Sequence, residues 1–384
     1  MVFVLLKSLL CPILKKLNLN DNFFVKKSFV DHIKKILSFL LKKVDPLGYL
    51  AAAQLDKEIK AEYVNALFIN VKGLVNSCTI CNDNQKADAD WIDFEVNQQH
   101  NGLLSIHINT NSLLRFIEDY LPKVKKSFVL VVGNSDLSFN SDLLSFSQLQ
   151  ILLDNPLLKA VFAQNMDMGH PKVLPLPIGV DYHNVWEKPR KNSLGYRLTP
   201  LLHERLLLKV AAESIKPVER RNLMYCNWHF KMDRGNRNEC FEKVNHQLCF
   251  FEERHLDRLQ NYNKQAIFKY VLSPSGMGID CYRTWEAIIL GCIPILKRSS
   301  WTNQFDHLPV IIVDTWEELT MEMLDEQYNH LIKREFDYSY IFMDYWKMAI
   351  KMGYLPTTNP AYQMTLDEYH QKIRSFHSSV FNSF

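Results

Sequence analysis

The stretch that decides the fold is residues 271–296, which read VLSPSGMGIDCYRTWEAIILGCIPIL. A short apolar run enters a loop that contains Gly276 and Gly278, and a helical pattern follows and ends at Gly291. A second apolar run, residues 293–296, comes directly after it. The pattern predicts a strand–loop–helix–strand unit. Because a loop that opens a helix presents backbone N–H groups without partners inside the helix, this loop is suited to bind an anion.

The polar side chains of this unit suit a phosphorylated ligand. Arg283 and Glu286 are three residues apart, so they share one helix face, and Asp280 precedes them on the same side. A guanidinium is suited to a diphosphate, whereas a carboxylate is suited to a pair of sugar hydroxyls. These features predict a nucleotide-sugar site formed by Ser273, Gly276, Gly278, Asp280, Arg283 and Glu286.

The same residues resemble the donor-binding segment of exostosin-like glycosyltransferases. The resemblance rests on SPxGxGxDxxRxWEA at residues 273–287, GCIPI at 291–295, FAQN at 162–165 and LPIGVD at 176–181. It extends over about half the chain. It implies the GT-B fold, in which two Rossmann-like domains face a cleft and the C-terminal domain holds the nucleotide. It also implies that Glu286 binds the ribose and that transfer needs no bound metal.

Length and composition predict a folded protein of two domains. The chain has 384 residues, of which 47% are apolar and 23% charged. The net charge of +3, with no basic stripe among aromatic residues, disfavours nucleic-acid binding. The predicted division is a basic helical extension at 1–50, an N-terminal Rossmann-like acceptor domain at 51–215, a C-terminal Rossmann-like nucleotide-sugar domain at 216–350 and a helical tail at 351–384 that could cross back.

Alternating apolar runs and helical patterns predict a parallel, doubly wound sheet in each domain. The expected strands are 66–71, 105–108, 127–132, 161–164, 173–176, 222–228, 248–251, 268–272, 293–296 and 310–313. Residues 51–65 and 111–125 read as helices. Capping-box patterns at 315–318 and 365–368 each predict the start of a helix.

Further cations could assist the predicted donor site. Lys297 and Arg298 end the strand after the central helix, and Arg234 and Arg237 follow the first strand of the second domain. Basic groups near the phosphates would stabilise the charge of the leaving diphosphate. For Arg234 and Arg237 taken singly, a solvated or ion-paired surface side chain is the competing interpretation.

A general base is needed if the reaction inverts the anomeric centre. Asp136 is the first candidate, because it follows the strongest strand pattern of the N-terminal domain. Asp181 and His183 come next, and Asp167 and His170 are weaker candidates. Each of them has a structural or solvated alternative, and the sequence leaves retention and inversion open.

The first 44 residues hold nine Lys and two Asp, and residues 26–44 predict a basic amphipathic helix. That helix could lie on an anionic membrane surface or pack on the protein with its Lys face solvated. No apolar run is long enough to span a bilayer, and the signal-peptide pattern is weak, because the charges lie inside and after the apolar part. Eight scattered cysteines without a disulfide framework favour a cytoplasmic location, with peripheral membrane contact as an option.

Two other motifs are weaker than the central segment. Asp88-Ala-Asp90 matches the DxD metal motif of a different transferase fold, but no apolar strand leads into it. The Gly276-x-Gly278 pair lacks the third glycine of a dinucleotide fingerprint, since Cys281 stands there. The prediction is therefore a metal-independent glycosyltransferase that uses a nucleoside diphosphate sugar, with UDP expected, and a glycan or glycoconjugate hydroxyl. The alternatives are a GDP-sugar (fucosyltransferase-like) enzyme, a catalytically silent glycan-binding or scaffold relative, and a membrane-surface interaction protein.

Overall fold

The computed structural model describes residues 46–82, 102–140, 142–187 and 197–381. By its internal contacts the chain divides into one unit from Met1 to Glu58 and a second from Ile59 to Phe384. Helix α3 (Pro46–Asn65), predicted at 51–65, begins in the first unit and ends in the second. The predicted basic helix at 26–44 lies outside the described residues, so its role stays a prediction.

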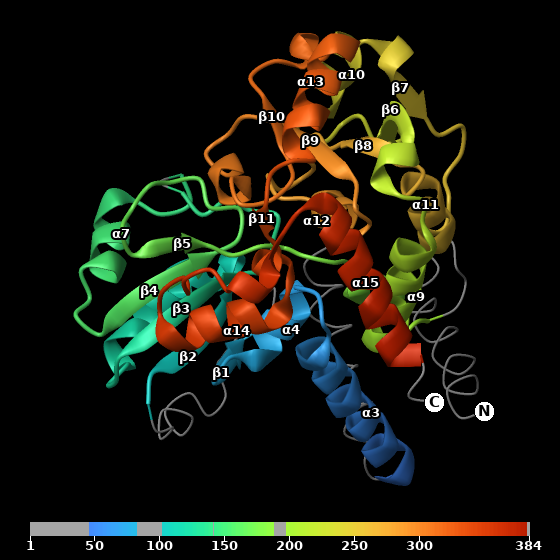
Figure 1. Cartoon of the computed structure of the whole chain (residues 1–384). Coiled ribbons are helices and arrows are strands. Elements are labelled where there is room, and N and C mark those ends of the chain that lie inside the picture. Colours follow the sequence, from blue (N-terminus) through green and yellow to red (C-terminus); the bar gives the residue numbers. More distant parts are fainter. Residues whose placement is uncertain (1–45, 83–101, 141, 188–196, 382–384) are drawn as a thin grey trace, which may run out of the picture. The chain divides into compact units, whose positions relative to one another are not determined.

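The first sheet has five parallel strands in the order in which they occur along the chain (Figure 1). They are β1 (Ile80–Asn82), β2 (Leu104–Asn109), β3 (Phe128–Gly133), β4 (Leu158–Ala163) and β5 (Val173–Pro175). Four of these strands confirm predictions made from apolar runs. The strand expected at 66–71 is wrong: Phe68 and Asn70 form only isolated bridges, and helix α4 (Val71–Ser77) begins where Asn70 caps it.

The two faces of this sheet are covered by different parts of the chain. One face packs on the helical segment from Thr110 to Lys123, made of η1 (Thr110–Ser112), α6 (Leu113–Arg115), η2 (Phe116–Tyr120) and η3 (Leu121–Lys123), and on α7 (Phe146–Leu153). The opposite face, with Val131 and Phe162, packs on α4 and on α14 (Met343–Met352). A parallel sheet is stable only when both faces are buried. Helix α14, which comes late in the chain, therefore helps α4 to close this face.

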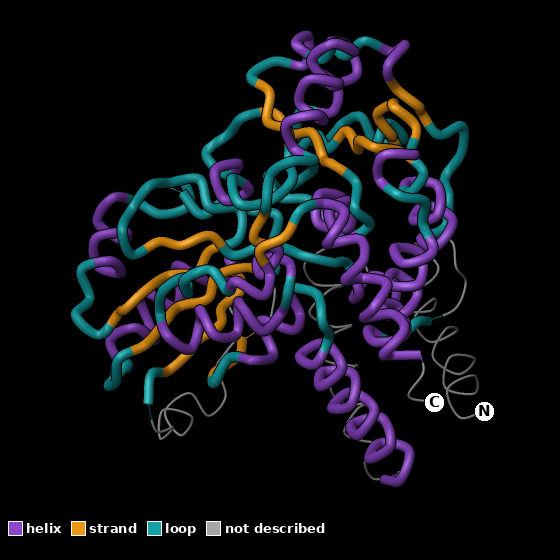
Figure 2. Tube along the Cα trace, viewed as in Figure 1, coloured by secondary structure: helices purple, strands orange, loops and turns teal. Residues whose placement is uncertain are grey.

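The second sheet also has five parallel strands, in the order β10-β9-β8-β6-β7. They are β6 (Arg221–Cys226), β7 (Cys249–Phe251), β8 (Phe268–Leu272), β9 (Ile293–Lys297) and β10 (Ile311–Val313), and all five were predicted. Helices α10 (Arg237–Lys243), α11 (Arg258–Gln265), α12 (Tyr282–Ile289) and α13 (Met321–Leu331) alternate with them (Figure 2). The strand order reverses between β6 and β8. In open α/β sheets, ligands bind at the carboxyl ends of the strands on either side of such a reversal.

The remaining elements connect the two sheets. Helix α15 (Leu366–Phe381) packs along α9 (Pro200–Glu213), and β11 (Phe336–Asp337) pairs with β12 (Gln363–Met364). Short helix α8 (Tyr182–Glu187) follows β5. The capping box that opens α15 is confirmed, since Thr365 N donates to Glu368 Oε2 at 2.8 Å and Glu368 N donates to Thr365 Oγ1 at 3.4 Å. Helix α14 also returns to the first sheet, and the predicted domain boundaries, including the tail at 351–384, stay predictions.

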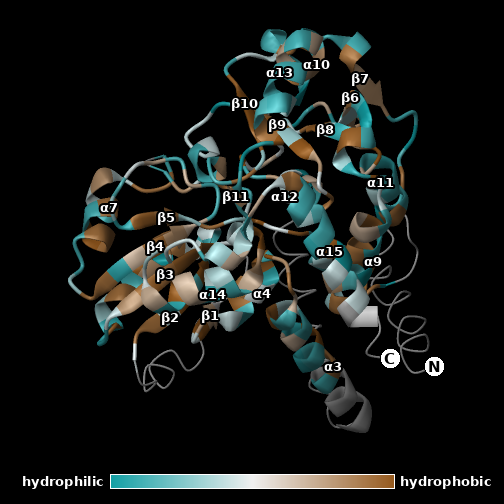
Figure 3. Ribbon diagram, viewed as in Figure 1, coloured by the Kyte–Doolittle hydropathy of each residue, from teal (hydrophilic) through white to brown (hydrophobic). Residues whose placement is uncertain are grey.

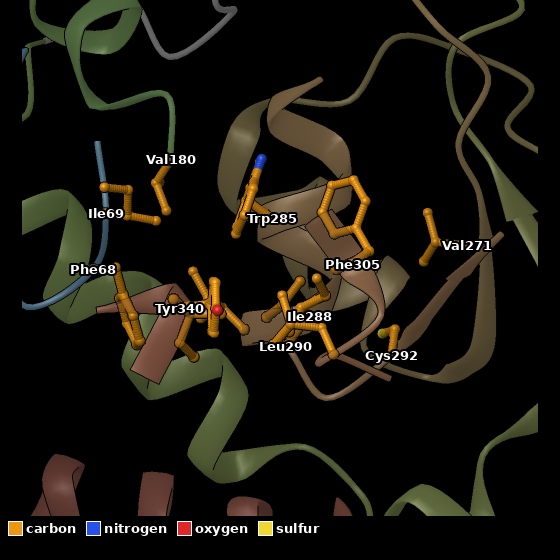
Figure 4. Close-up of a cluster of buried hydrophobic side chains, with 14 of the residues drawn as sticks. Phe68, Ile69, Val180, Val271, Trp285, Ile288, Leu290, Cys292, Phe305 and Tyr340 are labelled. Atoms are coloured by element: carbon orange, nitrogen blue, oxygen red, sulfur yellow. The ribbon is translucent and has the colours of Figure 1, made fainter. Parts of the chain in front are cut away.

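One buried cluster extends from the first sheet to the second. It includes Val131 of β3, Trp346 of α14 and Val271 of β8, and part of it is shown in Figure 4. Trp285 of α12 lies in it, fully buried, with its ring 5.3 Å from that of Phe305. Figure 3 shows the apolar colouring of the strands that supply this core. Because the two sheets share one core, packing holds the loops at their carboxyl ends in position relative to one another.

Candidate functional site

Two adjoining cavities open at the carboxyl ends of β6 and β8. The first, called here the cation cavity, has a volume of about 310 Å³ and is lined by residues of the β6–α10 loop, the β7–α11 loop and α12. The second, the junction cavity, has a volume of about 270 Å³ and adds Asp136, Ile178 and Asp181 from the first-sheet side. The cavities share six residues: Asn227, Arg234, Arg237, Arg258, Asn261 and Arg283. They therefore form one continuous polar recess at the position that the strand order indicates.

The cation cavity carries a large excess of positive charge. Its basic side chains are Lys231, Arg234, Arg237, Arg254, Arg258 and Arg283. Among the described residues that line it, Glu252 is the one carboxylate. Such a concentration of guanidinium groups in a recess is suited to a ligand with several negative charges.

Arg237 shows the electrostatic cost of this arrangement. Its Nη1 donates to the carbonyl oxygens of Trp228 and Lys231 at 3.3 and 3.2 Å, which fixes the side chain in the cavity wall. Its buried Nε has no hydrogen-bond partner among the described residues. Burial, together with the neighbouring Arg283 and Arg234, lowers the pKa of Arg237 to about 10. An anion in the cavity would relieve this repulsion.

Arg283 lies where the sequence predicted, in the first turn of α12. Its Nη1 donates to Pro274 O at 3.1 Å and to Ser273 Oγ at 3.3 Å, and it lines both cavities. The N-cap residue Cys281 makes no side-chain capping bond. The positive end of α12 therefore faces the junction cavity, which Tyr282 also lines.

The turn that contains Gly276 and Gly278 differs from the phosphate-binding loop that the sequence led us to expect. Three of its amides donate to protein acceptors: Ser275 N to Asn236 Oδ1 at 2.7 Å, Gly276 N to Gly278 O at 3.1 Å and Asp280 N to Asn165 Oδ1 at 3.0 Å. These three amides are not available to a ligand. The predicted part of the turn's backbone in anion binding is thereby narrowed to its other amides, and the guanidinium groups that line the cavities are the stronger anion-binding groups.

Gly278 and Asp280 join the turn to the first-sheet side. A Cβ at Gly278 would lie 2.8 Å from the side-chain amide of Asn165. Asp280 Oδ2 accepts the Ile178 N–H at 2.8 Å, and its Oδ1 accepts Trp285 Nε1–H at 2.9 Å. Burial raises the pKa of Asp280 to about 7, although these N–H donors oppose the shift. Asp280 was predicted to bind the donor, but its carboxyl group is engaged in holding the structure together.

Glu286 is engaged by a residue that the sequence analysis missed. Arg258 Nη1 donates to Glu286 Oε1 at 3.0 Å, and Arg258 Nη2 donates to Asp181 Oδ2 at 2.6 Å. The Tyr262 hydroxyl also donates to Glu286 Oε1 at 3.0 Å. The predicted contact of Glu286 with a ribose would have to compete with these bonds. A sequence signal for Arg258 existed: Asp257 and Gln260 form a capping box, which places Arg258 at the start of α11.

The three candidate bases differ in their surroundings. Asp136 is exposed and lines the junction cavity. Asp181 is buried, which favours its neutral form, but Arg258, His183 and Asn184 together hold its pKa below the usual value. His183 lies with its Nδ1 3.4 Å from Asp181 Oδ1 and is not among the residues that line either cavity. Asp136 is therefore the carboxylate best placed to meet a substrate hydroxyl.

Four further predicted residues lie away from the recess. Lys297 is paired with Glu239 at 2.5 Å and Arg298 with Asp314, and neither lines a cavity. The weaker base candidates are also occupied, since Asp167 accepts a bond from Ser300 and His170 accepts the Lys172 N–H at 3.1 Å. Side chains that follow a strand can point to either side of it. Their position in the sequence therefore could not show whether these four residues reach the recess.

Aromatic side chains line the outer part of the cation cavity. The Phe230 ring lies 4.2 Å from the His255 ring, nearly parallel to it, and 4.2 Å from the His229 ring. Phe230 and His255 both line the cavity. An exposed aromatic ring such as His255 beside cations suits a heterocyclic base attached to phosphates.

Some other predictions fall on residues outside the described region or can be checked only within it. Asp88 and Asp90 lie outside it. Within it, no three His, Cys, Asp or Glu side chains gather to form a metal site, and no helix combines the length and apolarity needed to cross a membrane.

No protein-family model and no curated protein matches the chain.

Proposed function

We propose that this chain is a glycosyltransferase with the GT-B arrangement, which transfers a sugar from a nucleoside diphosphate sugar to a hydroxyl of a glycan or glycoconjugate without a resident metal. The observation that carries the proposal is the cation cavity at the β6/β8 reversal, joined to a cavity that contains Asp136. Nucleoside, diphosphate and sugar form an extended ligand with its charge in the middle. The recess holds matching groups: the aromatic rings of Phe230 and His255, the arginines that line both cavities, and the carboxylate of Asp136.

The diphosphate would lie against the cations that the two cavities share. Arg234, Arg237 and Arg283 line both cavities, and none of them is paired to a carboxylate within the described residues in the way that Arg258 is. When the bond between the sugar and the diphosphate breaks, negative charge grows on the leaving oxygen. Fixed guanidinium groups at that place stabilise the transition state without reorganising during the reaction.

The base of the nucleotide would stack on the exposed ring of His255, which Phe230 supports from behind. Stacking of this kind accepts any base, so it is compatible with the expected UDP and equally with GDP. The sugar would then extend from the shared cations into the junction cavity, towards Asp136.

Asp136 would act as the general base for transfer with inversion. It would take the proton of the acceptor hydroxyl while the acceptor oxygen bonds to the anomeric carbon and the diphosphate leaves. Asp181 is less suited to this task, because Arg258 and Asn184 already occupy its oxygens and hold its pKa low.

Product formation from UDP- and GDP-sugars, by the wild-type chain and by Asp136→Asn, tests this assignment. We expect Asp136→Asn to lower kcat by about 10²- to 10⁴-fold while nucleotide affinity stays the same. Asp142→Asn, at another exposed aspartate of the same connection, is the control and should behave as wild type. Nucleotide binding with no turnover by the wild type would instead favour the catalytically silent alternative.

A further inference from the structure

The wall shared by the two cavities carries two neutral side chains whose orientation the protein fixes. Asn227 follows β6, and Asn261 lies on α11. Asn227 Nδ2 donates to Asn261 Oδ1 at 2.6 Å, and the Tyr225 hydroxyl donates to the same oxygen at 2.8 Å. With two bonds accepted, the capacity of Asn261 Oδ1 is filled.

Each amide consequently turns its other polar atom away from this bond. Asn261 retains the donors of Nδ2, and Asn227 retains the acceptor Oδ1. Both residues are half-buried and line both cavities. Tyr225 supports the pair from the core, where its ring packs on Phe250 and Phe268 at 6.4 and 5.3 Å. The wall thus offers the ligand the N–H donors of Asn261 Nδ2, a second N–H of Asn227 Nδ2 and the acceptor oxygen of Asn227 side by side.

This pair has the wrong chemistry for phosphate and the right chemistry for hydroxyl groups. Ionised phosphate oxygens only accept hydrogen bonds, so Asn227 Oδ1 would repel them. A hydroxyl group both donates and accepts, and two adjacent hydroxyls of a sugar ring can satisfy both amides at once. Arg234, Arg237 and Arg283, which line the same two cavities, supply the positive charge that the phosphates need.

We propose that Asn227 and Asn261 bind adjacent hydroxyl groups of a ring attached to the diphosphate. This inference rests on the proposed function and adds the residues that select the ring. Two rings meet the description: the ribose of the nucleotide and the sugar that is transferred. A ring without the hydroxyls would leave the two amides without partners, which is how such sites discriminate between ligands.

The test compares the affinities of pyrophosphate, UDP and UDP-glucose by calorimetry, or of the guanosine series if the protein prefers GDP. The variant is Asn261→Asp, because a carboxylate still accepts from Tyr225 and Asn227 but cannot donate to the ligand. Its added charge repels all three ligands, and it repels pyrophosphate, the most highly charged, most strongly. When each affinity is divided by that of pyrophosphate, this repulsion therefore cannot lower the ratio, and a fall reports a lost ring contact. We expect this ratio to fall by about tenfold for the ligand that carries the recognised ring.

The pattern of loss identifies the ring. A fall for both UDP and UDP-glucose assigns the ribose, and a fall for UDP-glucose alone assigns the transferred sugar. Asn227→Ala, a neutral variant, should give the same pattern. Asn263→Ala is the matched control, because Asn263 is on the same helix, donates to Leu259 O and lines neither cavity.

Unchanged ratios in both Asn227→Ala and Asn261→Asp would overturn the inference and leave the proposed function standing. If the wild-type protein bound none of the nucleotides, the proposed function would fail, and this inference would fail with it.

Discussion

At the residue scale, the type and sequence position of a side chain indicated the charge that it brings, but not the residue with which it pairs. Arg283 was found from its place in the helix that follows a glycine loop, and the structure brings it to both cavities. Arg258 was missed because its role depends on Asp181 and Glu286, which come from distant parts of the chain. Asp280 was assigned to the ligand, yet it bonds to Ile178 and Trp285. Such pairings depend on tertiary contacts that no local pattern contains.

The buried carboxyl of Asp280 predicts a pH dependence of stability. Its pKa is about 7 in the folded protein against an ordinary value of 3.8, so the folded state holds a proton that the unfolded state releases. The free energy of unfolding should therefore fall as the pH rises through this range. Urea unfolding at several pH values, compared with Asp280→Asn, isolates the contribution. Between about pH 5 and pH 8 the wild type should lose about 2 to 3 kcal/mol relative to the variant. A difference that stays constant or grows with pH would contradict this role.

At the element scale, apolar runs located most strands because buried parallel strands consist of little else. The run at 66–71 was misread, since Asn70 caps a helix there and ends any extended pairing. The region 111–125 was predicted as one helix and is helical from Thr110 to Lys123, but with α, 3₁₀ and π turns. The box at 315–318 forms on the 3₁₀ turn η8 (Trp316–Glu318), and α13 begins only at Met321 under a separate cap, Thr320.

The turn before α12 supplies the prediction at this scale. Gly278 lies against Asn165, and an added Cβ would approach the Asn165 amide to 2.8 Å, so Gly278→Ala must displace the contact that holds the turn. We expect a loss of about 1 to 3 kcal/mol in the free energy of unfolding, measured with urea. Gly169→Ala is the control, because nothing lies within 4 Å of its added Cβ, and it should be near neutral. Equal stability of the two variants would show that the turn is not held at Asn165.

At the scale of the whole molecule, the sequence indicated two parallel α/β sheets, and the structure contains them. It did not indicate that the first sheet keeps its strands in chain order or that α14 returns to cover it. That arrangement arises from burial: an amphipathic helix far along the chain covers a face that local helices leave open. Nor did it indicate that Asp136 and Asp181 line one recess with the cations of the second sheet.

The central claim is that this recess binds a nucleoside diphosphate through guanidinium groups. The most direct test measures the binding of UDP and GDP by thermal unfolding and by calorimetry. A nucleotide at 100 times its dissociation constant should stabilise the wild type by about 2.7 kcal/mol. Arg283→Gln should weaken that nucleotide by roughly tenfold or more, whereas Arg298→Gln, at a cation paired with Asp314 outside the recess, should bind like wild type. If no nucleoside diphosphate stabilises the folded wild type, or if Arg283→Gln binds as tightly as Arg298→Gln, the account is contradicted.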